Sequence, residues 1–269
     1  MEILKTLHPA PASEPLLGFL VAGFVLMVVG LVALTARRGP HVPLTSDKAT
    51  RRALLYSLVY GLCAACFSRV LQGALLGTEH SPWLLALGDV LFVTLSLLVW
   101  VMVVAEHHRL SDYGFRSVPV GRFLLITVMG LGAAALYAAG PVTRIASGAI
   151  VVTPDSLVFA VLFATFGSAL PGEILFRGFL MGSLGGRMSR WSRLALPALV
   201  FTAVRSVRFL PGVDLPVPAW LFYVFGQVLP LGLWWGLMRD LSGGSIWPGL
   251  ISHLVLEFCT ALASASPHA

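Results

Sequence analysis

Charged side chains are scarce in this sequence. Only 11% of its 269 residues are Asp, Glu, Lys or Arg, whereas 57% are hydrophobic, and the mean hydropathy is +0.88. No stretch outside the apolar runs is long enough to bury a core of its own, which argues against a separate water-soluble domain. Apolar runs of about 20 residues, the length that crosses ~30 Å of hydrocarbon, recur instead. The sequence therefore predicts an integral membrane protein.

Cysteine is also rare. The three residues are Cys63, Cys66 and Cys259, and only the first two have the C-x-x-C spacing. That pair lies inside an apolar run without the βαβ context of a redox motif, and no second cysteine pair or nearby histidine pair completes a zinc site. We interpret both residues as small side chains in helix packing.

Acidic residues are outnumbered, because 12 Asp and Glu against 18 Lys and Arg give a net charge of +6. The basic residues do not form one patch, so nucleic acid is not an expected partner. They lie in short loops, and one set of alternating loops holds Arg37, Arg38, Lys48, Arg51, Arg52, Arg109, Arg116, Arg122, Arg187, Arg190, Arg193 and Arg239. By the positive-inside rule this set faces the cytoplasm. We expect a multi-pass protein of the inner (cytoplasmic) membrane, with both termini on the non-cytoplasmic side.

The apolar runs lack the period-2 alternation of barrel strands. Only helices or closed barrels satisfy every backbone polar group in hydrocarbon, so these runs are predicted to be helices. The segments are Pro15–Thr35, Ala53–Leu76, Trp83–Ala105, Val120–Gly140, Ser156–Leu184, Leu194–Leu210, Val217–Met238 and Ser245–Ser264. The predicted fold class is all-α, a polytopic membrane helix bundle of about eight transmembrane helices.

Several ionisable side chains fall inside these predicted helices, although a charge at the bilayer centre costs at least ~2.5–3.5 kcal/mol. Arg69 and Asp89 lie at matching depths from the non-cytoplasmic ends of the second and third segments. We interpret these two as a structural ion pair, because nothing near them in the sequence suggests chemistry.

Five further ionisable residues come from three other segments: Glu173, Arg177, Arg205, His253 and Glu257. Counted from the cytoplasmic ends of their helices, Glu173, Arg205 and His253 lie at depths of about 12–17 Å. Arg177 follows Glu173 at i,i+4 and shares its helix face. Glu257 follows His253 at the same spacing and shares the face of His253. We predict that the five side chains form one polar site within the membrane.

Each of these residues has a structural alternative when it is taken alone. Glu173 and Arg177 could form a packing salt bridge, and a single His253 could serve as an interhelical hydrogen bonder. Arg205 could extend its charge toward the membrane surface. The convergence favours a shared site, because one packing pair needs no third and fourth partner at the same depth.

Pro171 and Gly172 stand directly before Glu173. Both are poor residues for a helix interior, since proline lacks the backbone N–H and glycine is conformationally free. We expect the helix to be weakened here, with freed backbone groups that line a cavity.

Three segments of the C-terminal half carry these residues: GEILFRGFL, ALVFTAVR and GSIWPGLISHLVLEF. In order and content they resemble the EExxxR, FxxxH and HxxxN motifs of the CPBP family, which comprises CAAX proteases and bacteriocin-processing enzymes. That family includes the Ras-converting enzyme type of CAAX prenyl protease. LSDYGFRS, from Leu110 to Ser117, resembles the loop that often precedes the family's core.

The resemblance covers the chain from about Leu110 to Ala263, and the first three predicted helices lie outside it. It therefore implies two regions. Residues 1–109 are expected to form an N-terminal three-helix membrane region. Residues 110–269 are expected to form a CPBP-like membrane domain that carries the motifs.

The match to the first two motifs is incomplete. Glu173 and Arg177 match the first, but Gly172 stands where the family has its first acid. Phe201 matches the second motif, and Arg205 replaces its histidine. In the resembled enzymes, the first glutamate and a histidine are thought to activate water.

The third motif keeps its histidine as His253 and has Glu257 in place of the asparagine. In the resembled enzymes the second histidine and the asparagine are thought to stabilise the oxyanion. One hypothesis is a rewired site for glutamate-dependent peptide-bond hydrolysis near the cytoplasmic membrane face. There Glu257 takes a proton from water and Arg205 stabilises the oxyanion. The substrate is then a membrane-embedded or membrane-proximal peptide or protein.

The alternative hypothesis is a catalytically inactive pseudoprotease that acts as a membrane binding or scaffold partner. Arginine stays charged near neutral pH and cannot act as the general base that a histidine supplies. On this view Arg177 pairs with Glu173, and Arg205 pairs with Glu257. The four charges then neutralise one another in a rigid polar core.

Two further kinds of function, transport and metal binding, fit the sequence less well. Transport is less favoured because no inverted repeat or pair of broken helices is visible. A metal site formed by Glu173, His253 and Glu257 has only one histidine beside two acids, which is a weak signal. We expect neither a metal nor another cofactor.

Overall fold

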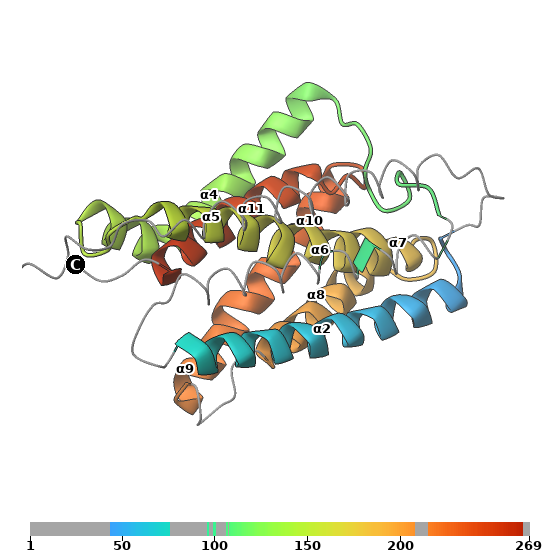
Figure 1. Cartoon of the computed structure of the whole chain (residues 1–269). Helices are drawn as coiled ribbons and strands as arrows, with labels where there is room; N and C mark the ends of the chain where they lie inside the picture. Colours follow the sequence, from blue (N-terminus) through green and yellow to red (C-terminus); the bar gives the residue numbers. More distant parts are fainter. Residues whose placement is uncertain are drawn as a thin grey trace, which may run out of the picture. The chain divides into compact units, whose positions relative to one another are not determined.

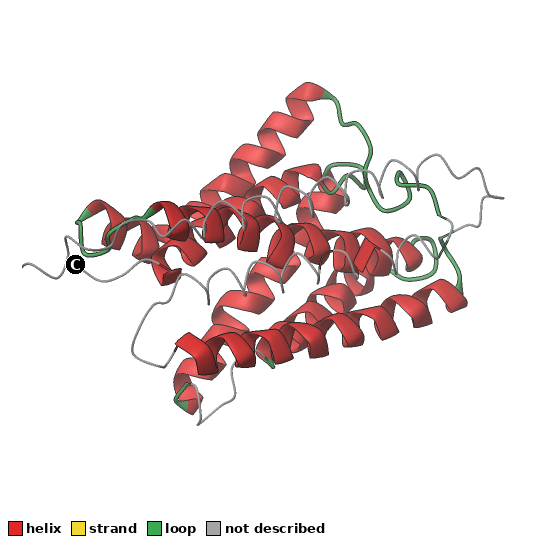
Figure 2. Ribbon diagram, in the orientation of Figure 1, coloured by secondary structure: helices red, strands yellow, loops and turns green. Residues whose placement is uncertain are grey.

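The computed structural model of the chain describes residues 44–75, 96, 99–100, 106, 108–207 and 215–265. These ranges contain helices and connecting loops, and no β-strand lies within them (Figures 1 and 2). The all-α prediction is confirmed for this part of the chain. Every described element belongs to one compact unit, Gly39–Ala269.

The described helices follow one another in this order along the chain. First come α2 (Asp47–Leu75) and α4 (Val120–Ala146). A continuous stretch follows, made of α5 (Pro154–Leu162), η2 (Phe163–Ala169), α6 (Leu170–Gly172), η3 (Glu173–Leu180) and α7 (Met181–Ser183). Then come α8 (Arg190–Ser206), the continuous stretch of α9 (Val217–Leu221), η4 (Phe222–Val228) and α10 (Leu229–Leu241), and finally α11 (Trp247–Ala265). The η segments are π-helices, whose hydrogen bonds run from residue i to i+5.

Four helical stretches are long and apolar enough to cross a membrane: Val120–Ala146, Pro154–Ser183, Val217–Leu241 and Trp247–Ala265. They give the chain its membrane-embedded character. The expected number of about eight spans is not confirmed by the described residues. Of the other predicted segments, Pro15–Thr35 and most of Trp83–Ala105 lie outside these residues. The sixth forms α8, which has only 17 residues, and the second forms part of α2, which also carries a charged first turn.

Two predictions from the N-terminal part stay untested. The ion pair between Arg69 and Asp89 lies outside the residues whose side chains are described. The boundary between regions 1–109 and 110–269 also stays a prediction. α2 lies before that boundary, and it packs against η3 and α8, which lie after it.

Local sequence signals set where the site-bearing helices begin. The hydroxyl of Thr153 caps α5 by accepting a hydrogen bond from the backbone N–H of Ser156 at 3.1 Å. Pro154 occupies the first helical position, where its missing N–H has no intrahelical partner to lose. α10 ends in a turn in which Gly243 and Gly244 have φ of 72° and 92°, a backbone conformation that favours glycine. That turn directs the chain back into α11.

The stretch from Pro154 to Ser183 is continuous despite Pro171 and Gly172. The expected weakening before Glu173 takes the form of π-helical winding on both sides of the short α6, and the helix does not break. Proline cannot donate an i→i−4 hydrogen bond, so an irregular ladder at this point is physically reasonable. Most of η2 and all of η3 are buried, so the widened turns lie inside the bundle.

A close backbone approach joins η3 to the loop before α4. A Cβ atom added at Gly178 would lie 2.7 Å from the carbonyl oxygen of Tyr113, which is closer than real Cβ contacts allow. The ring of Tyr113 packs edge-on against Phe179, with centroids 5.6 Å apart. Glycine at this position therefore lets the loop lie directly on the helix that carries the acidic motif.

α11 packs against α4, α5, η2 and α10, and Figure 1 shows α4 and α5 next to it. α8 packs in turn on α10 and η3. This arrangement brings the motif-bearing elements η3, α8 and α11 around a shared interior.

Candidate functional site

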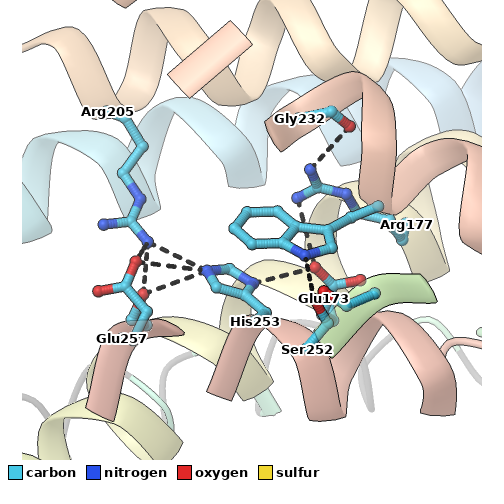
Figure 3. A network of polar contacts seen from close by, with 10 residues as sticks. Glu173, Arg177, Arg205, Gly232, Ser252, His253 and Glu257 are labelled. Atoms are coloured by element: carbon cyan, nitrogen blue, oxygen red, sulfur yellow. Dashed lines mark hydrogen bonds and ion pairs between the residues drawn. The ribbon is translucent and has the colours of Figure 1, made fainter. Parts of the chain in front are cut away.

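The imidazole of His253 on α11 lies at the centre of a polar network and is completely buried (Figure 3). Its Nδ1 lies 3.0 Å from Oε1 of Glu173 on η3. Its Nε2 lies 3.2 Å from Nη2 of Arg205 on α8 and 3.5 Å from Oε1 of Glu257 on α11. With Arg177, which contacts Glu173, all five residues singled out from the sequence lie in this one network.

Glu173 and Arg177 form the buried end of the network, with side-chain exposures of 0% and 1%. Nη1 of Arg177 lies 3.6 Å from Oε1 of Glu173, and its Nη2 donates a hydrogen bond to the carbonyl oxygen of Gly232 at 3.0 Å. The guanidinium also lies over the ring of Phe201, 4.4 Å from its centroid. The carboxylate, the carbonyl and the aromatic face offset part of the hydration that this buried cation loses, while its Nη1 has no hydrogen-bond partner.

Arg205 and Glu257 form the surface end of the network, with side-chain exposures of 17% and 12%. Nη2 of Arg205 donates to Oε1 of Glu257 at 2.5 Å. The same nitrogen donates a hydrogen bond to Oγ of Ser168 on η2. The exposed part of the network lies mainly at this end.

The contacts of His253 indicate which ring nitrogen carries the proton. Nη2 of Arg205 has no lone pair, so Nε2, which faces it, cannot donate a hydrogen bond to it. Nδ1 faces a carboxylate oxygen of Glu173, which only accepts when ionised, so Nδ1–H is the donor. In this tautomer the lone pair of Nε2 points to the surface end of the network.

Trp235 on α10 fixes the plane of this imidazole. The two rings stack with centroids 3.7 Å apart and an interplanar angle of 18°. Nε1 of Trp235 donates to Oγ of Ser252 at 3.3 Å, and this hydroxyl donates to the carbonyl oxygen of Gly130 on α4 at 2.8 Å. The sequence does not single out Trp235, because nothing in its spacing distinguishes it from other apolar aromatic residues.

Two glutamates and a histidine do not converge on a single point. Glu173 contacts Nδ1 of His253 and Glu257 contacts Nε2, which are on different sides of the ring. The described residues contain no group of three His, Cys, Asp or Glu side chains arranged to hold a metal ion. The geometry therefore does not support the ligand set considered from the sequence.

A comparison with protein families matches residues 154–259 to the type II CAAX prenyl endopeptidase Rce1-like family. Residues 154–259 therefore correspond to an Rce1-like domain. This confirms the resemblance drawn from the motifs, and the matched range contains all five network residues. The comparison with curated proteins gives no match, and neither does the comparison with solved structures.

Within the Rce1-like domain, the departures from the family motifs surround the imidazole. A Cβ atom added at Gly172, where the family has its first acid, would lie 3.5 Å from Cε1 of His253, in ordinary van der Waals contact. Arg205 and Glu257, the other two departures, both contact Nε2 of His253. All three replacements therefore change the immediate surroundings of one ring.

Ser168 is a second residue of the Rce1-like domain that the sequence does not single out. It is 3% exposed, and its Oγ lies 3.5 Å from Nε2 of His253. In a regular α-helix, residues five positions apart point about 140° away from each other, which would separate Ser168 from Glu173. The π-helical winding of η2 and η3 lets both of them reach the same imidazole.

Proposed function

We propose that the chain is a CPBP-type intramembrane endopeptidase that hydrolyses a peptide bond near the cytoplasmic face of the inner membrane. Its substrate is a membrane-embedded or membrane-proximal peptide or protein. The observation that carries the proposal is the contact between Glu173 and Nδ1 of His253, which leaves Nε2 directed toward Arg205. A carboxylate that holds a neutral imidazole in one tautomer is an arrangement for general-base catalysis.

The roles follow from the donors and acceptors of each group. His253 takes the proton through Nε2, and Glu173 stabilises the imidazolium that forms. The guanidinium of Arg205, positioned beforehand in a dry site, stabilises negative charge on the carbonyl oxygen of the substrate. Glu257 already accepts a short charge-assisted bond from Arg205, so we assign it the compensation of that cation and not proton abstraction from water.

The test is a cleavage assay with the full chain in liposomes and a panel of peptides that span or adjoin the bilayer, read by mass spectrometry. His253→Gln is expected to reduce cleavage by about 10²–10⁴-fold, because it removes the general base. The matched control is His108→Gln, since this histidine packs between Tyr113 and Phe179 in a separate ring cluster. Equal cleavage by His253→Gln and by the unchanged chain would contradict the assignment.

A second candidate is the pseudoprotease, and one observation favours it. Each glutamate in the network has an arginine close by, 3.6 Å for Glu173 with Arg177 and 2.5 Å for Glu257 with Arg205. The four charges sum to zero, so the network is also a plausible rigid core of a binding protein. In that case photocrosslinking from the surface end captures a membrane peptide that is not cut.

The two candidates respond differently to restoration of the family motifs. The variant Gly172→Glu, Arg205→His, Glu257→Asn replaces all three departures at once. A pseudoprotease is expected to gain cleavage that the unchanged chain lacks. The rewired enzyme is expected to cleave the same peptide before any change is made, which the liposome assay measures directly.

A further inference from the structure

A serine hydroxyl lies on the lone-pair side of the imidazole, beside the proposed general base. Oγ of Ser168 is 3.5 Å from Nε2 of His253, and Nδ1 of the same ring is 3.0 Å from Oε1 of Glu173. The imidazole of His253 therefore lies between the hydroxyl of Ser168 and the carboxylate of Glu173 and contacts both. A nucleophile near a base that a third group orients is the geometric signature of covalent catalysis, with contacts that are often looser before substrate binds.

The hydrogen-bond directions also fit a nucleophilic serine. Arg205 donates to Oγ of Ser168, so this hydroxyl accepts from the guanidinium and its own proton is directed elsewhere. The tautomer of His253 leaves Nε2 as an acceptor for that proton. The guanidinium beside Oγ would also stabilise the alkoxide as the proton leaves.

Access to Ser168 leads through the surface end of the network. Ser168 itself is 3% exposed, whereas the side chain of Arg205, which contacts it, is 17% exposed. A peptide carbonyl that approaches Oγ from this end meets the guanidinium before it meets the serine. The guanidinium of Arg205, which covers the hydroxyl of Ser168, is therefore also placed to bind the carbonyl oxygen of the substrate.

We propose that Ser168 is the nucleophile of this site, within a Ser168–His253–Glu173 triad, so that hydrolysis proceeds through an acyl-enzyme. Oγ attacks the peptide carbonyl carbon, and the Oγ–H proton passes to Nε2. When the tetrahedral intermediate collapses, the C–N bond breaks and Nε2 returns the proton to the leaving amine nitrogen. Water then attacks the ester carbon and gives a proton to Nε2. The ester C–O bond breaks, the proton returns to Oγ, and the acid product leaves.

This inference rests on the proposed function but is tested separately from it. The probe is an alkyl fluorophosphonate, which forms a covalent bond with a serine oxygen that an adjacent base activates. The full chain in liposomes is incubated with the probe, and the modified residue is located by peptide mass spectrometry. We expect a single adduct at Ser168, lost in Ser168→Ala and formed at least about tenfold more slowly in His253→Gln.

The matched control is Ser57→Ala, since Ser57 is also buried but donates only to the carbonyl oxygen of Ala53 within α2. This variant is expected to react with the probe at the unchanged rate. Thermal unfolding in detergent is measured for all three variants, so that a lost adduct is not confused with a lost fold. Absence of an adduct at Ser168 in the folded, unchanged chain would overturn the proposal.

The peptide assay separates this inference from the proposed function. Ser168→Ala is expected to lower cleavage by about 10³-fold or more, with a melting temperature like that of Ser57→Ala. If folded Ser168→Ala cleaves at the unchanged rate, the endopeptidase stands and the nucleophile is wrong, because water then attacks directly. If the unchanged chain cuts no peptide yet forms the Ser168 adduct, the triad stands and the peptide substrate is wrong.

Discussion

The two ends of the network differ in burial and in how closely they follow the family motifs. At the buried end, Glu173 and Arg177 match the family and are 0% and 1% exposed. At the surface end, Arg205 and Glu257 replace the family's residues and are 17% and 12% exposed. The residues that orient the imidazole therefore match the family motifs, whereas the residues at the end where we propose that the substrate binds differ from them. The following predictions are ordered by their expected effect on the free energy of unfolding.

The largest effect is expected at the buried end. Glu173→Gln leaves the guanidinium of Arg177 buried without a compensating charge, which costs about 3–5 kcal/mol of unfolding free energy. Chemical or thermal unfolding of the full chain in detergent measures it. The double variant Glu173→Gln, Arg177→Met removes both charges and is expected to recover most of the loss. A cost below about 1 kcal/mol for the single variant would mean that the pair does not act as an ion pair.

The next largest effect is expected one residue beyond Arg177. Gly178→Ala forces a methyl group against the carbonyl oxygen of Tyr113, 2.7 Å from the ideal Cβ position, and separates the loop from η3. We expect a loss of about 1–3 kcal/mol, measured by the same unfolding experiment. Gly132→Ala in α4 is the control, because no atom lies within 4 Å of its added Cβ. Equal stability of the two variants would contradict the close approach.

An effect of similar size is expected between the two ends, at the ring stacked on His253. Trp235→Phe keeps an aromatic face but loses volume and the bond from Nε1 to Ser252, for an expected cost of about 2 kcal/mol. Ser252→Ala removes the same bond from its other side. A double-mutant cycle measures the coupling of the two residues, which is expected to be about 0.5–1.5 kcal/mol. Strict additivity would show that the bond does not contribute.

The smallest effect on stability is expected at the surface end. Glu257→Gln keeps an oxygen that accepts the hydrogen bond from the part-exposed Arg205, so the unfolding free energy is expected to fall by about 1 kcal/mol or less. Cleavage is nevertheless expected to fall by about 10–100-fold, because the uncompensated cation next to Nε2 opposes protonation of the imidazole. Paired unfolding and cleavage measurements test this separation. Complete loss of cleavage would instead return the proton-accepting role to Glu257.

The convergence of the five ionisable residues could be predicted from the sequence. Charges are costly in hydrocarbon, and a helix rises by a fixed amount per residue, so Glu173, Arg205 and His253 can be assigned similar depths from their positions in the apolar segments alone. Depth can be assigned without knowing which helices are neighbours. It is enough to predict this site because few ionisable residues fall within the spans.

Ser168 and Trp235 could not be predicted in the same way. The angular position of Ser168 relative to Glu173 depends on π-helical winding, which hydrophobic periodicity does not reveal. Trp235 is one of seven tryptophans in an apolar chain, and only the packing of α10 on α11 selects it. The predicted number of about eight spans stays unconfirmed, because Pro15–Thr35 and most of Trp83–Ala105 lie outside the described residues, in which four spans are found.

The π-helical winding between Phe163 and Leu180 makes the number of residues in this stretch a functional quantity. Inserting a single apolar residue between Ser168 and Glu173 would add one more step to the helix between them. The hydroxyl would then rotate by roughly 100° about the helix axis relative to the carboxylate. The proposed enzyme would therefore lose its chemistry through a one-codon insertion that leaves every reactive side chain in the sequence.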